Sequence, residues 1–126
     1  MEARKIIITG GATRIGAAIA KQLSGTNKEI LIHFNKSESK AEKLKKELEL
    51  NGTKVYLVKG DLSRENDVNK IVKHAKSKLK YFDCLINNAS LFENDKIETF
   101  TTDSWNKHLT TNLRTPALLS LSLIHI

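Results

Sequence analysis

A glycine-containing segment near the start of the chain could bind a pyrophosphate. Residues 9–16 (TGGATRIG) lie between an apolar run and a helical pattern that begins at Arg14. Glycines let the backbone turn tightly and approach phosphates, and a helix start offers unpaired N–H groups and a positive dipole end. A tight turn without a ligand is the alternative interpretation. The residues expected at the ligand are Thr9, Gly10, Arg14, Ile15 and Gly16.

The residues after the second apolar run indicate which dinucleotide would fit. An NAD site usually has Asp or Glu at this point, where it binds the ribose hydroxyls. This chain has HFNKS at 33–37, with no carboxylate before Glu38. Charge-assisted hydrogen bonds to phosphate are strong, so a lysine, an amide and a hydroxyl suit a 2′-phosphate. Alternatively, the lysine and serine merely open a solvated helix. We predict NADP(H), held here by His33, Asn35, Lys36 and Ser37.

Two more polar segments follow the third and fourth apolar runs. Asp61 and Leu62 come after the third run, and Asn88, Ala89 and Ser90 come after the fourth. Ligands of parallel α/β sheets lie beyond the carboxyl ends of the strands. The Asp61 carboxylate could accept a hydrogen bond from an adenine amino group, and the small residues of the second segment leave room for ribose and nicotinamide. Ordinary turns are the alternative at both places.

The hydrophobic pattern predicts a sheet that would bring these segments to one edge. Strands are expected at 5–9, 29–34, 53–58 and 82–86. They alternate with helices at 14–23, from Ser37 or Ser39 to 50, from Ser63 to 79, and from about Asp103 onward. This order predicts an α/β fold with a doubly wound, Rossmann-type parallel sheet that ends after the fourth strand and helix.

Apolar residues recur at helical spacing within the predicted helices. The first and last helices carry such residues at four-residue steps, and Pro116 predicts a kink in the last one. The stripes are Ile15, Ile19 and Leu23; Ala41, Leu44 and Leu48; Val68, Ile71, Val72, Ala75 and Leu79; and Trp105, Leu109 and Leu113.

Composition excludes several classes of protein. A chain of 126 residues suits one domain, and its lone cysteine, Cys84, rules out an internal disulfide and fits a reducing cytoplasm. The net charge of +7 comes mostly from lysines interleaved with glutamates at 36–80, without a basic block that would indicate nucleic-acid binding. No apolar run approaches the roughly 20 residues that span a bilayer. We expect no nucleic acid, membrane or metal as partner.

Four segments in register, 9–16, 61–62, 87–90 and 112–114, resemble the short-chain dehydrogenase/reductase family over residues 4–120. The resemblance implies a Rossmann domain, NAD(P), a small-molecule substrate, hydride transfer, and a homotetramer or homodimer. It also implies that Asn112 is the catalytic asparagine, which holds a water in a proton relay. A role on the helix surface is the alternative for this residue.

Three details are similar to the pteridine reductase branch of that family. Arg14 replaces a glycine, HFNKS follows the second strand, and Phe92 follows the NNAS segment. By this resemblance, Phe92 would stack on a pterin ring, and Arg14 would lie near the cofactor phosphates and the substrate. Packing within a loop is the alternative for Phe92.

The resemblance implies a catalytic tyrosine with a lysine four residues later. Neither tyrosine of this chain has a lysine at that spacing. Gly60 and Leu85 stand four residues after Tyr56 and Tyr81.

The last six residues, LSLIHI, are the translation of CTGTCTCTTATACACATC, which matches a transposon mosaic end used in the preparation of sequencing libraries. We therefore interpret 1–120 as an NADP-binding half-domain and 121–126 as an adapter-derived tail. Expressed alone, such a fragment should be inactive and poorly soluble, because its fourth strand would be an open edge.

The sequence thus predicts the cofactor-binding half of an NADPH-dependent reductase that acts on a C=O or C=N bond. A pterin is the sharper prediction for the substrate. The alternatives are a 3-oxoacyl or sugar reductase of the same family, a non-catalytic NADP-sensing protein, and a nucleic-acid-binding domain.

Overall fold

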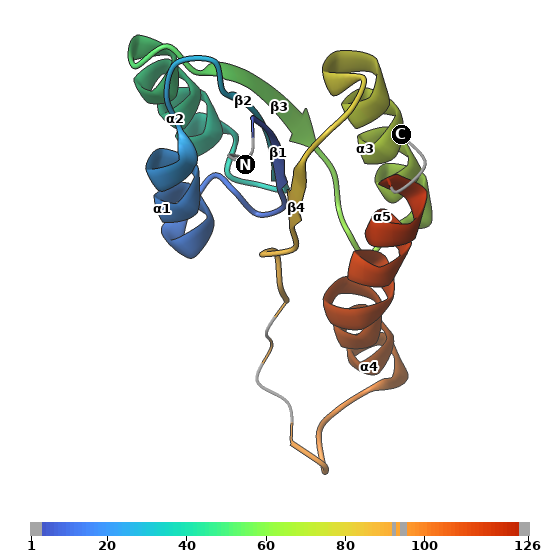
Figure 1. Ribbon diagram of the computed structural model, residues 1–126. Coiled ribbons are helices and arrows are strands. Elements are labelled where there is room, and N and C mark those ends of the chain that lie inside the picture. Colours follow the sequence, from blue (N-terminus) through green and yellow to red (C-terminus); the bar gives the residue numbers. More distant parts are fainter. Residues whose placement is uncertain (1–3, 92, 94–95, 124–126) are drawn as a thin grey trace.

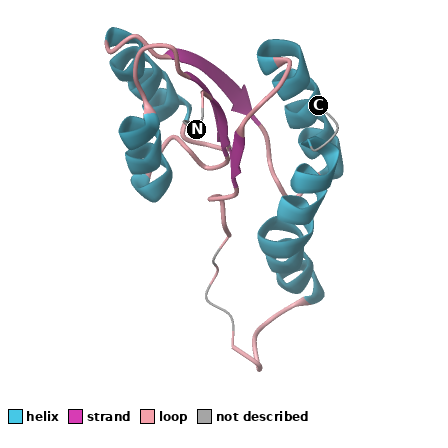
Figure 2. Ribbon diagram, viewed as in Figure 1, coloured by secondary structure: helices cyan, strands magenta, loops and turns pink. Residues whose placement is uncertain are grey.

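Four parallel strands form one sheet with helices on both faces (Figures 1 and 2). The computed structural model describes residues 4–91, 93 and 96–123. Its strands are β1 (Lys5–Ile8), β2 (Glu29–Phe34), β3 (Lys54–Lys59) and β4 (Cys84–Ile86), in the order β3-β2-β1-β4. The predicted doubly wound, Rossmann-type sheet is confirmed. The helices are α1 (Arg14–Leu23), α2 (Glu38–Leu50), α3 (Glu65–Leu79), α4 (Thr102–Leu109) and α5 (Thr115–Leu123), with a π-helical turn η1 (Thr110–Arg114) before α5.

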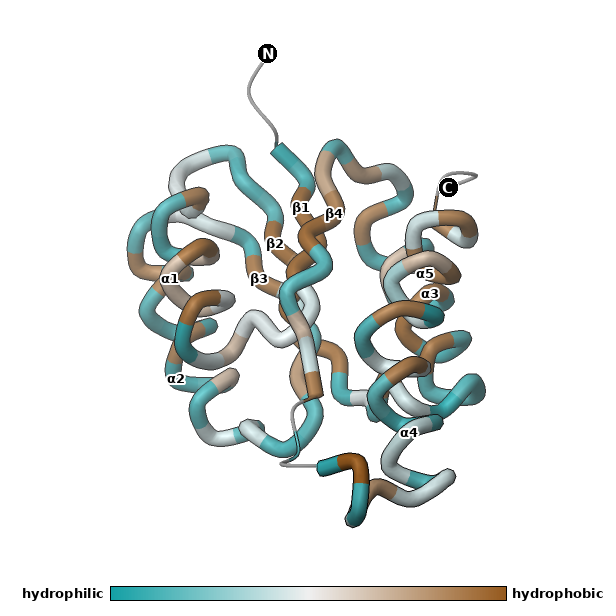
Figure 3. The backbone as a smooth tube through the Cα atoms, turned by 90° about the horizontal axis from the view of Figure 1, so that it is seen from below, coloured by the Kyte–Doolittle hydropathy of each residue, from teal (hydrophilic) through white to brown (hydrophobic). Residues whose placement is uncertain are grey.

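The central strand β1 packs against helices on both of its faces. Ile6 and Ile8 belong to a core cluster that includes buried residues of α1 and α2, whereas Ile7 belongs to a second cluster with α3 and α5. Figure 3 shows the apolar strands between these two helical layers. An unbroken apolar run is typical of a parallel strand that is covered on both sides. The expected stripe of α3, from Val68 to Leu79, is buried.

Two expectations for the helix starts are wrong. The α1 stripe was expected to include Ile15, but this side chain is 69% exposed, and the buried residues of α1 are Gly16 and Ala20. The start of α1 lies so close to the preceding loop that only the smallest residue fits between them. Ser63 does not cap α3, which begins after Arg64; the Ser63 hydroxyl instead donates to Asp61.

The last helix presents its expected apolar stripe to solvent. Trp105, Leu109 and Leu113 are all exposed, whereas the buried residues include Thr111 and Thr115. Pro116 has no N–H to donate to the carbonyl oxygen of Asn112, and the π-helical turn lies immediately before it. The irregularity predicted at Pro116 is therefore present, and the helix is divided into α4, η1 and α5.

Within the described residues, β4 is an edge strand that pairs with β1 alone. Its three residues, Cys84, Leu85 and Ile86, are half-buried. The side chain of Cys84 is a free thiol. The open edge expected at the fourth strand is thus present in this part of the chain.

Buried polar side chains join the carboxyl ends of the strands. The Thr9 hydroxyl oxygen accepts hydrogen bonds from the backbone N–H groups of Asn88 and Ala89, each at 3.0 Å, and so connects the ends of β1 and β4. His33, 2% exposed, accepts the Gly10 N–H on Nδ1 at 3.0 Å. Its Nε2 lies 2.8 Å from the Gly60 carbonyl oxygen, and this pairing requires a neutral ring with its proton on Nε2.

We expect His33 to make folding sensitive to mild acid. Burial lowers the pKa of His33 below its usual 6.5, outweighing the Gly60 hydrogen bond and the nearby Asp61 charge, which raise it. The unfolded chain therefore takes up this proton first, so the stabilisation is complete above about pH 6.5 and is lost as the pH falls through the folded-state pKa. The loss is about 1.4 kcal/mol for each unit of difference between the two pKa values.

Urea unfolding at pH 7, 6 and 5 measures this effect. His33→Asn keeps an acceptor for the Gly10 N–H and has no ring to titrate, so its free energy of unfolding should fall less between pH 7 and pH 5. His74→Gln is the matched control, because burial also lowers the pKa of His74 but this side chain is less buried than His33. Equal pH slopes for the wild type and His33→Asn would contradict the prediction.

Candidate functional site

The loop between β1 and α1 is held in a tight conformation by a contact that excludes a side chain. A Cβ atom at Gly16 would lie 2.2 Å from the Gly10 carbonyl oxygen and 2.7 Å from Nδ2 of Asn88. Asn88 Nδ2 donates to the carbonyl oxygens of Thr9 and Gly10, at 3.1 and 3.0 Å. The first turn of α1, the loop and the segment after β4 therefore meet at Gly16.

Arg14 occupies a backbone conformation that favours glycine. Its φ is +48°, and Gly10 in the same loop has φ +61°. An L-residue in this left-handed region costs about 1–2 kcal/mol. This explains why a glycine is the easier choice at position 14, and it identifies a strained residue in the loop. The Arg14 side chain is exposed and lines the groove described below.

The start of α1 is the part of the loop best placed to meet an anion. The Gly10 and Gly11 N–H groups both donate to His33, to its ring and to its carbonyl oxygen. Thr13, the N-cap of α1, makes no side-chain capping hydrogen bond, and the first turn of α1 has no acidic residue. The backbone N–H groups and the dipole of that turn therefore face the groove without a competing carboxylate.

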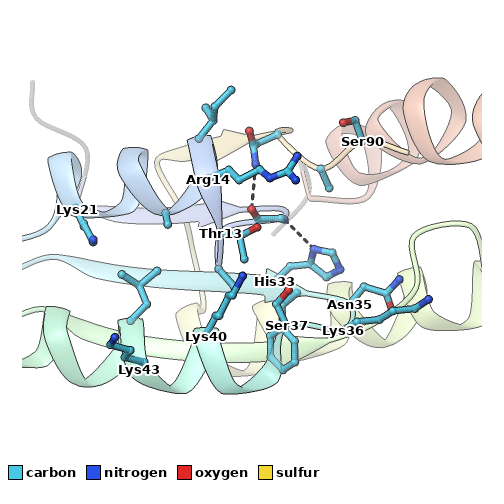
Figure 4. Close-up of a pocket in the computed structure, with 18 of the residues that line it drawn as sticks. Thr13, Arg14, Lys21, His33, Asn35, Lys36, Ser37, Lys40, Lys43 and Ser90 are labelled. Carbon is cyan, nitrogen blue, oxygen red and sulfur yellow. Dashed lines mark hydrogen bonds between the residues drawn. The ribbon is translucent and has the colours of Figure 1, made fainter. Parts of the chain in front are cut away.

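A basic groove of about 940 Å³ lies between this loop, α1 and the start of α2. Five cationic side chains line it, against the single carboxylate of Glu47, which pairs with Lys21 at 3.5 Å. Figure 4 shows Lys21 on α1, and Lys40 and Lys43 on α2, along the groove. Such a charge balance favours a ligand with several negative charges. The five cations are Arg14, Lys21, Lys36, Lys40 and Lys43.

Most of the residues predicted at the first loop, the second strand and the fourth strand line this groove. Thr9 and Gly16 do not; they lie behind the loop and hold it in place. His33 lines the groove, but both of its ring nitrogens are bonded to backbone atoms, so it positions the loop. The predicted residues that line the groove are Gly10, Arg14, Ile15, His33, Asn35, Lys36, Ser37, Asn88, Ala89 and Ser90.

Sequence reasoning missed three lysines of the groove wall, namely Lys21, Lys40 and Lys43. One signal was available, because Lys40 and Lys43 are three residues apart within the predicted second helix and therefore share a face. Lys21 carries no such signal, since it reaches the groove from α1 only through the packing of α1 beside α2.

A second, smaller cavity of about 230 Å³ adjoins the groove and contains both residues predicted after the third strand. Oδ1 of Asp61 accepts the Ser63 N–H at 2.9 Å and the Ser63 hydroxyl at 2.7 Å. The hydroxyl bond is the main cause that lowers the pKa of Asp61, so this carboxylate is ionised at neutral pH. Leu62 contributes an apolar wall, and the two cavities share His33, Asn35, Lys36, Ala89, Ser90 and Leu91.

Thr111, which was not predicted, also lines the smaller cavity. Its hydroxyl oxygen is buried and has no hydrogen-bond partner within the described part of the chain. A buried polar group without a partner costs about 1–3 kcal/mol. Apart from its position beside Asn112, the sequence gives no signal for this residue, because the apolar stripe of Trp105, Leu109 and Leu113 predicts that another face of the helix is buried.

The Asn112 side chain fastens the segment that follows β4. Its Oδ1 accepts the Leu91 N–H at 2.7 Å, and its Nδ2 donates to the Leu91 carbonyl oxygen at 2.8 Å. Asn112 lines neither cavity, and both polar atoms of its amide are bonded to Leu91. The side chain therefore holds Leu91 in place, and the catalytic role expected for Asn112 stays a prediction. Phe92, the residue expected to stack on a substrate ring, lies outside the described residues.

Within residues 4–91, 93 and 96–123, no group of three or more His, Cys, Asp or Glu residues is arranged to hold a metal ion. None of the helices in these ranges has the length and apolar character needed to cross a membrane.

The sequence model of the short chain dehydrogenase family matches residues 4–125. A curated relative, the short-chain dehydrogenase/reductase FrzI of Cladobotryum sp, is 33% identical over 113 residues, which are 90% of this chain and 44% of the relative. The FolM alternative dihydrofolate reductase 1 of Brucella canis, solved with NADP, is 33% identical with a TM-score of 0.86, over 95% of this chain and 48% of that one.

A blue fluorescent protein from a metagenomic library, solved with NADPH, is 26% identical with a TM-score of 0.90, over 97% of this chain and 50% of that one. The chain thus spans about half the length of these relatives. Since the family model matches nearly all of its residues, the chain belongs to the short chain dehydrogenase family.

Proposed function

We propose that this chain binds NADP(H) in the basic groove, with the 2′-phosphate at the end of β2. The observation that carries the proposal is the charge of this region: Asn35, Lys36 and Ser37 line the groove, and Lys40 lies beside them on α2. A carboxylate that would repel a 2′-phosphate is not among the residues 33–37. A lysine ammonium and a serine hydroxyl supply charge-assisted hydrogen bonds to phosphate oxygens.

The other parts of the site are compatible with the same ligand. Gly16 lets α1 start directly against the loop, and a pyrophosphate at this helix start would accept hydrogen bonds from backbone N–H groups. Asp61 and Leu62 line the smaller cavity, which suits the adenine base. The Brucella protein and the metagenomic protein were solved with NADP and NADPH, respectively, which supports the assignment.

Replacing Lys36 should weaken binding of NADP⁺ specifically. We expect Lys36→Gln to lower the affinity for NADP⁺ by about three- to tenfold, since one charge-assisted hydrogen bond at an exposed site is lost. NAD⁺ lacks the 2′-phosphate, so its affinity should change little. Titration calorimetry with both nucleotides at low salt measures the two dissociation constants.

Lys46→Gln is the matched control for this experiment. It removes the same charge from α2, but Lys46 is exposed and does not line the groove. An equal loss of NADP⁺ affinity in both variants would indicate a general charge effect and would contradict a 2′-phosphate site at Lys36. Tighter binding of NAD⁺ than of NADP⁺ by the wild type would contradict the proposed cofactor.

For the full-length protein we propose hydride transfer from NADPH to a C=O or C=N bond. The nicotinamide supplies the hydride when the cofactor is bound. Within this chain, Asn112 orients the segment after β4 through Leu91, and Arg14 at the groove would meet an anionic or polar substrate group. A pterin is the finer proposal for the substrate, supported by the likeness to an alternative dihydrofolate reductase. The free Cys84 thiol suits a cytoplasmic location.

The substrate proposal is tested on the full-length protein by following NADPH oxidation. We expect turnover with a dihydropterin and competitive inhibition by a folate analogue. Turnover of 3-oxoacyl or sugar substrates, without inhibition by the folate analogue, would assign the protein to those reductases. Tight NADPH binding with no turnover of any of these substrates would favour a non-catalytic NADP-binding protein.

We also propose that the exposed stripe of Trp105, Leu109 and Leu113 contacts a second copy of the protein. These residues lie at four-residue steps on one continuous helical segment, and an apolar stripe of this kind is typical of an interface. Leu109→Lys should shift the full-length protein toward a smaller species in sedimentation experiments. Asn106→Asp, which changes charge on the same helix at an exposed residue that lines neither cavity, is the control. An unchanged oligomer in Leu109→Lys would contradict the proposal.

A further inference from the structure

The Thr111 hydroxyl is a buried polar group that the fold itself does not use. The residue is 7% exposed, and its Oγ1 is the one shielded side-chain N or O atom without a hydrogen-bond partner in the described part of the chain. Thr115, one turn further along, is buried too, but its hydroxyl donates to the Leu62 carbonyl oxygen at 2.5 Å. A buried threonine on this face can therefore find a hydrogen-bond partner within the protein, as Thr115 does.

Thr111 lines the smaller cavity, which has acceptor and apolar groups around it. Leu62 and Ala89 provide apolar surface, and Asp61 lies on the polar side. Both hydrogen bonds of the Asp61 carboxylate go to Oδ1, from Ser63, so Oδ2 has no donor among the residues that the structure describes. The cavity thus offers a carboxylate oxygen, a hydroxyl and apolar walls, which together suit a flat heterocycle with polar edges.

We propose that the Thr111 hydroxyl is a specificity-determining group that hydrogen-bonds the adenine base of the dinucleotide, beside Asp61. This inference rests on the proposed function and identifies a contact to the base within it. A hydroxyl both donates and accepts, so it can bond to a ring nitrogen or to the exocyclic amino group. The unpaired hydroxyl then destabilises the unliganded protein, and a hydrogen bond to the bound ligand removes this destabilisation.

The proposal predicts opposite effects of Thr111→Val on stability and on binding. Valine has the shape of threonine without the hydroxyl, so the unliganded variant should melt a few degrees higher, because no buried polar group is left unpaired. Its affinity for NADP⁺, NAD⁺ and 2′,5′-ADP should fall by the same factor, about fivefold, since one neutral hydrogen bond is lost. These three ligands share only the adenosine 5′-phosphate part.

Thr111→Ser keeps the hydroxyl and should bind nearly as well as the wild type. Thr110→Val is the matched control, because Thr110 is the neighbouring threonine and lines neither cavity; it should leave all three affinities unchanged. Scanning calorimetry gives the melting temperatures, and titration calorimetry gives the dissociation constants.

Three results would overturn the inference. Unchanged affinities in Thr111→Val would show that the hydroxyl does not contact the ligand. Lower affinity together with a lower melting temperature, not restored in Thr111→Ser, would show that the threonine has a structural role only. If the wild type binds none of the three ligands, both the proposed cofactor and the Thr111 contact are wrong. If the wild type binds them and Thr111→Val binds them equally well, only the Thr111 contact is wrong.

Discussion

The close approach of helix α1 to the Gly10 carbonyl oxygen is the constraint on which the rest of the site depends. Because a Cβ at Gly16 would lie 2.2 Å from that oxygen, the helix can start directly against the loop only with glycine at this position. The first turn of α1 lines the groove, and Arg14, its first residue, has a left-handed conformation. The close approach explains why Ile15 is exposed, since the buried side of this turn has no room for a larger residue.

The buried polar side chains near the loop hold it in place and are not available to a ligand. Thr9, His33 and Asn88 use their polar atoms on backbone groups of the loop and of the segment after β4. The donors that remain for a bound anion include the backbone at the start of α1 and the exposed cationic side chains of the groove, namely Arg14 and the four lysines. These two sets of donors differ in kind: the backbone donors are fixed by the fold, whereas the lysines are exposed and their contribution is screened by salt.

The sequence was sufficient to predict the sheet, because strand patterns and helix patterns alternate and each strand is an almost unbroken apolar run. It also located the groove at the loop and at the end of β2, where Lys36 and Ser37 follow directly on Phe34. It could not locate Lys21, whose position depends on how α1 packs beside α2. The backbone hydrogen bonds of His33 could not be predicted either, because residue type does not distinguish a buried ring between two backbone groups from a ligand-binding ring; its contact with a cofactor stays a prediction.

The least predictable part of the site depends on Pro116. Because proline has no N–H for the Asn112 carbonyl oxygen, the helix cannot keep α-helical hydrogen bonding at that point, and a π-helical turn spans Thr110–Arg114. Thr111 and Thr115, four residues apart, lie on one buried side of this segment, while Leu109 and Leu113 face solvent. A strict α-helical period applied to this segment indicates a stripe of Trp105, Leu109 and Leu113 and gives no reason to examine the threonines. The hydroxyl that lines the smaller cavity therefore lies within the irregular turn, on the buried side of a segment whose apolar stripe faces solvent.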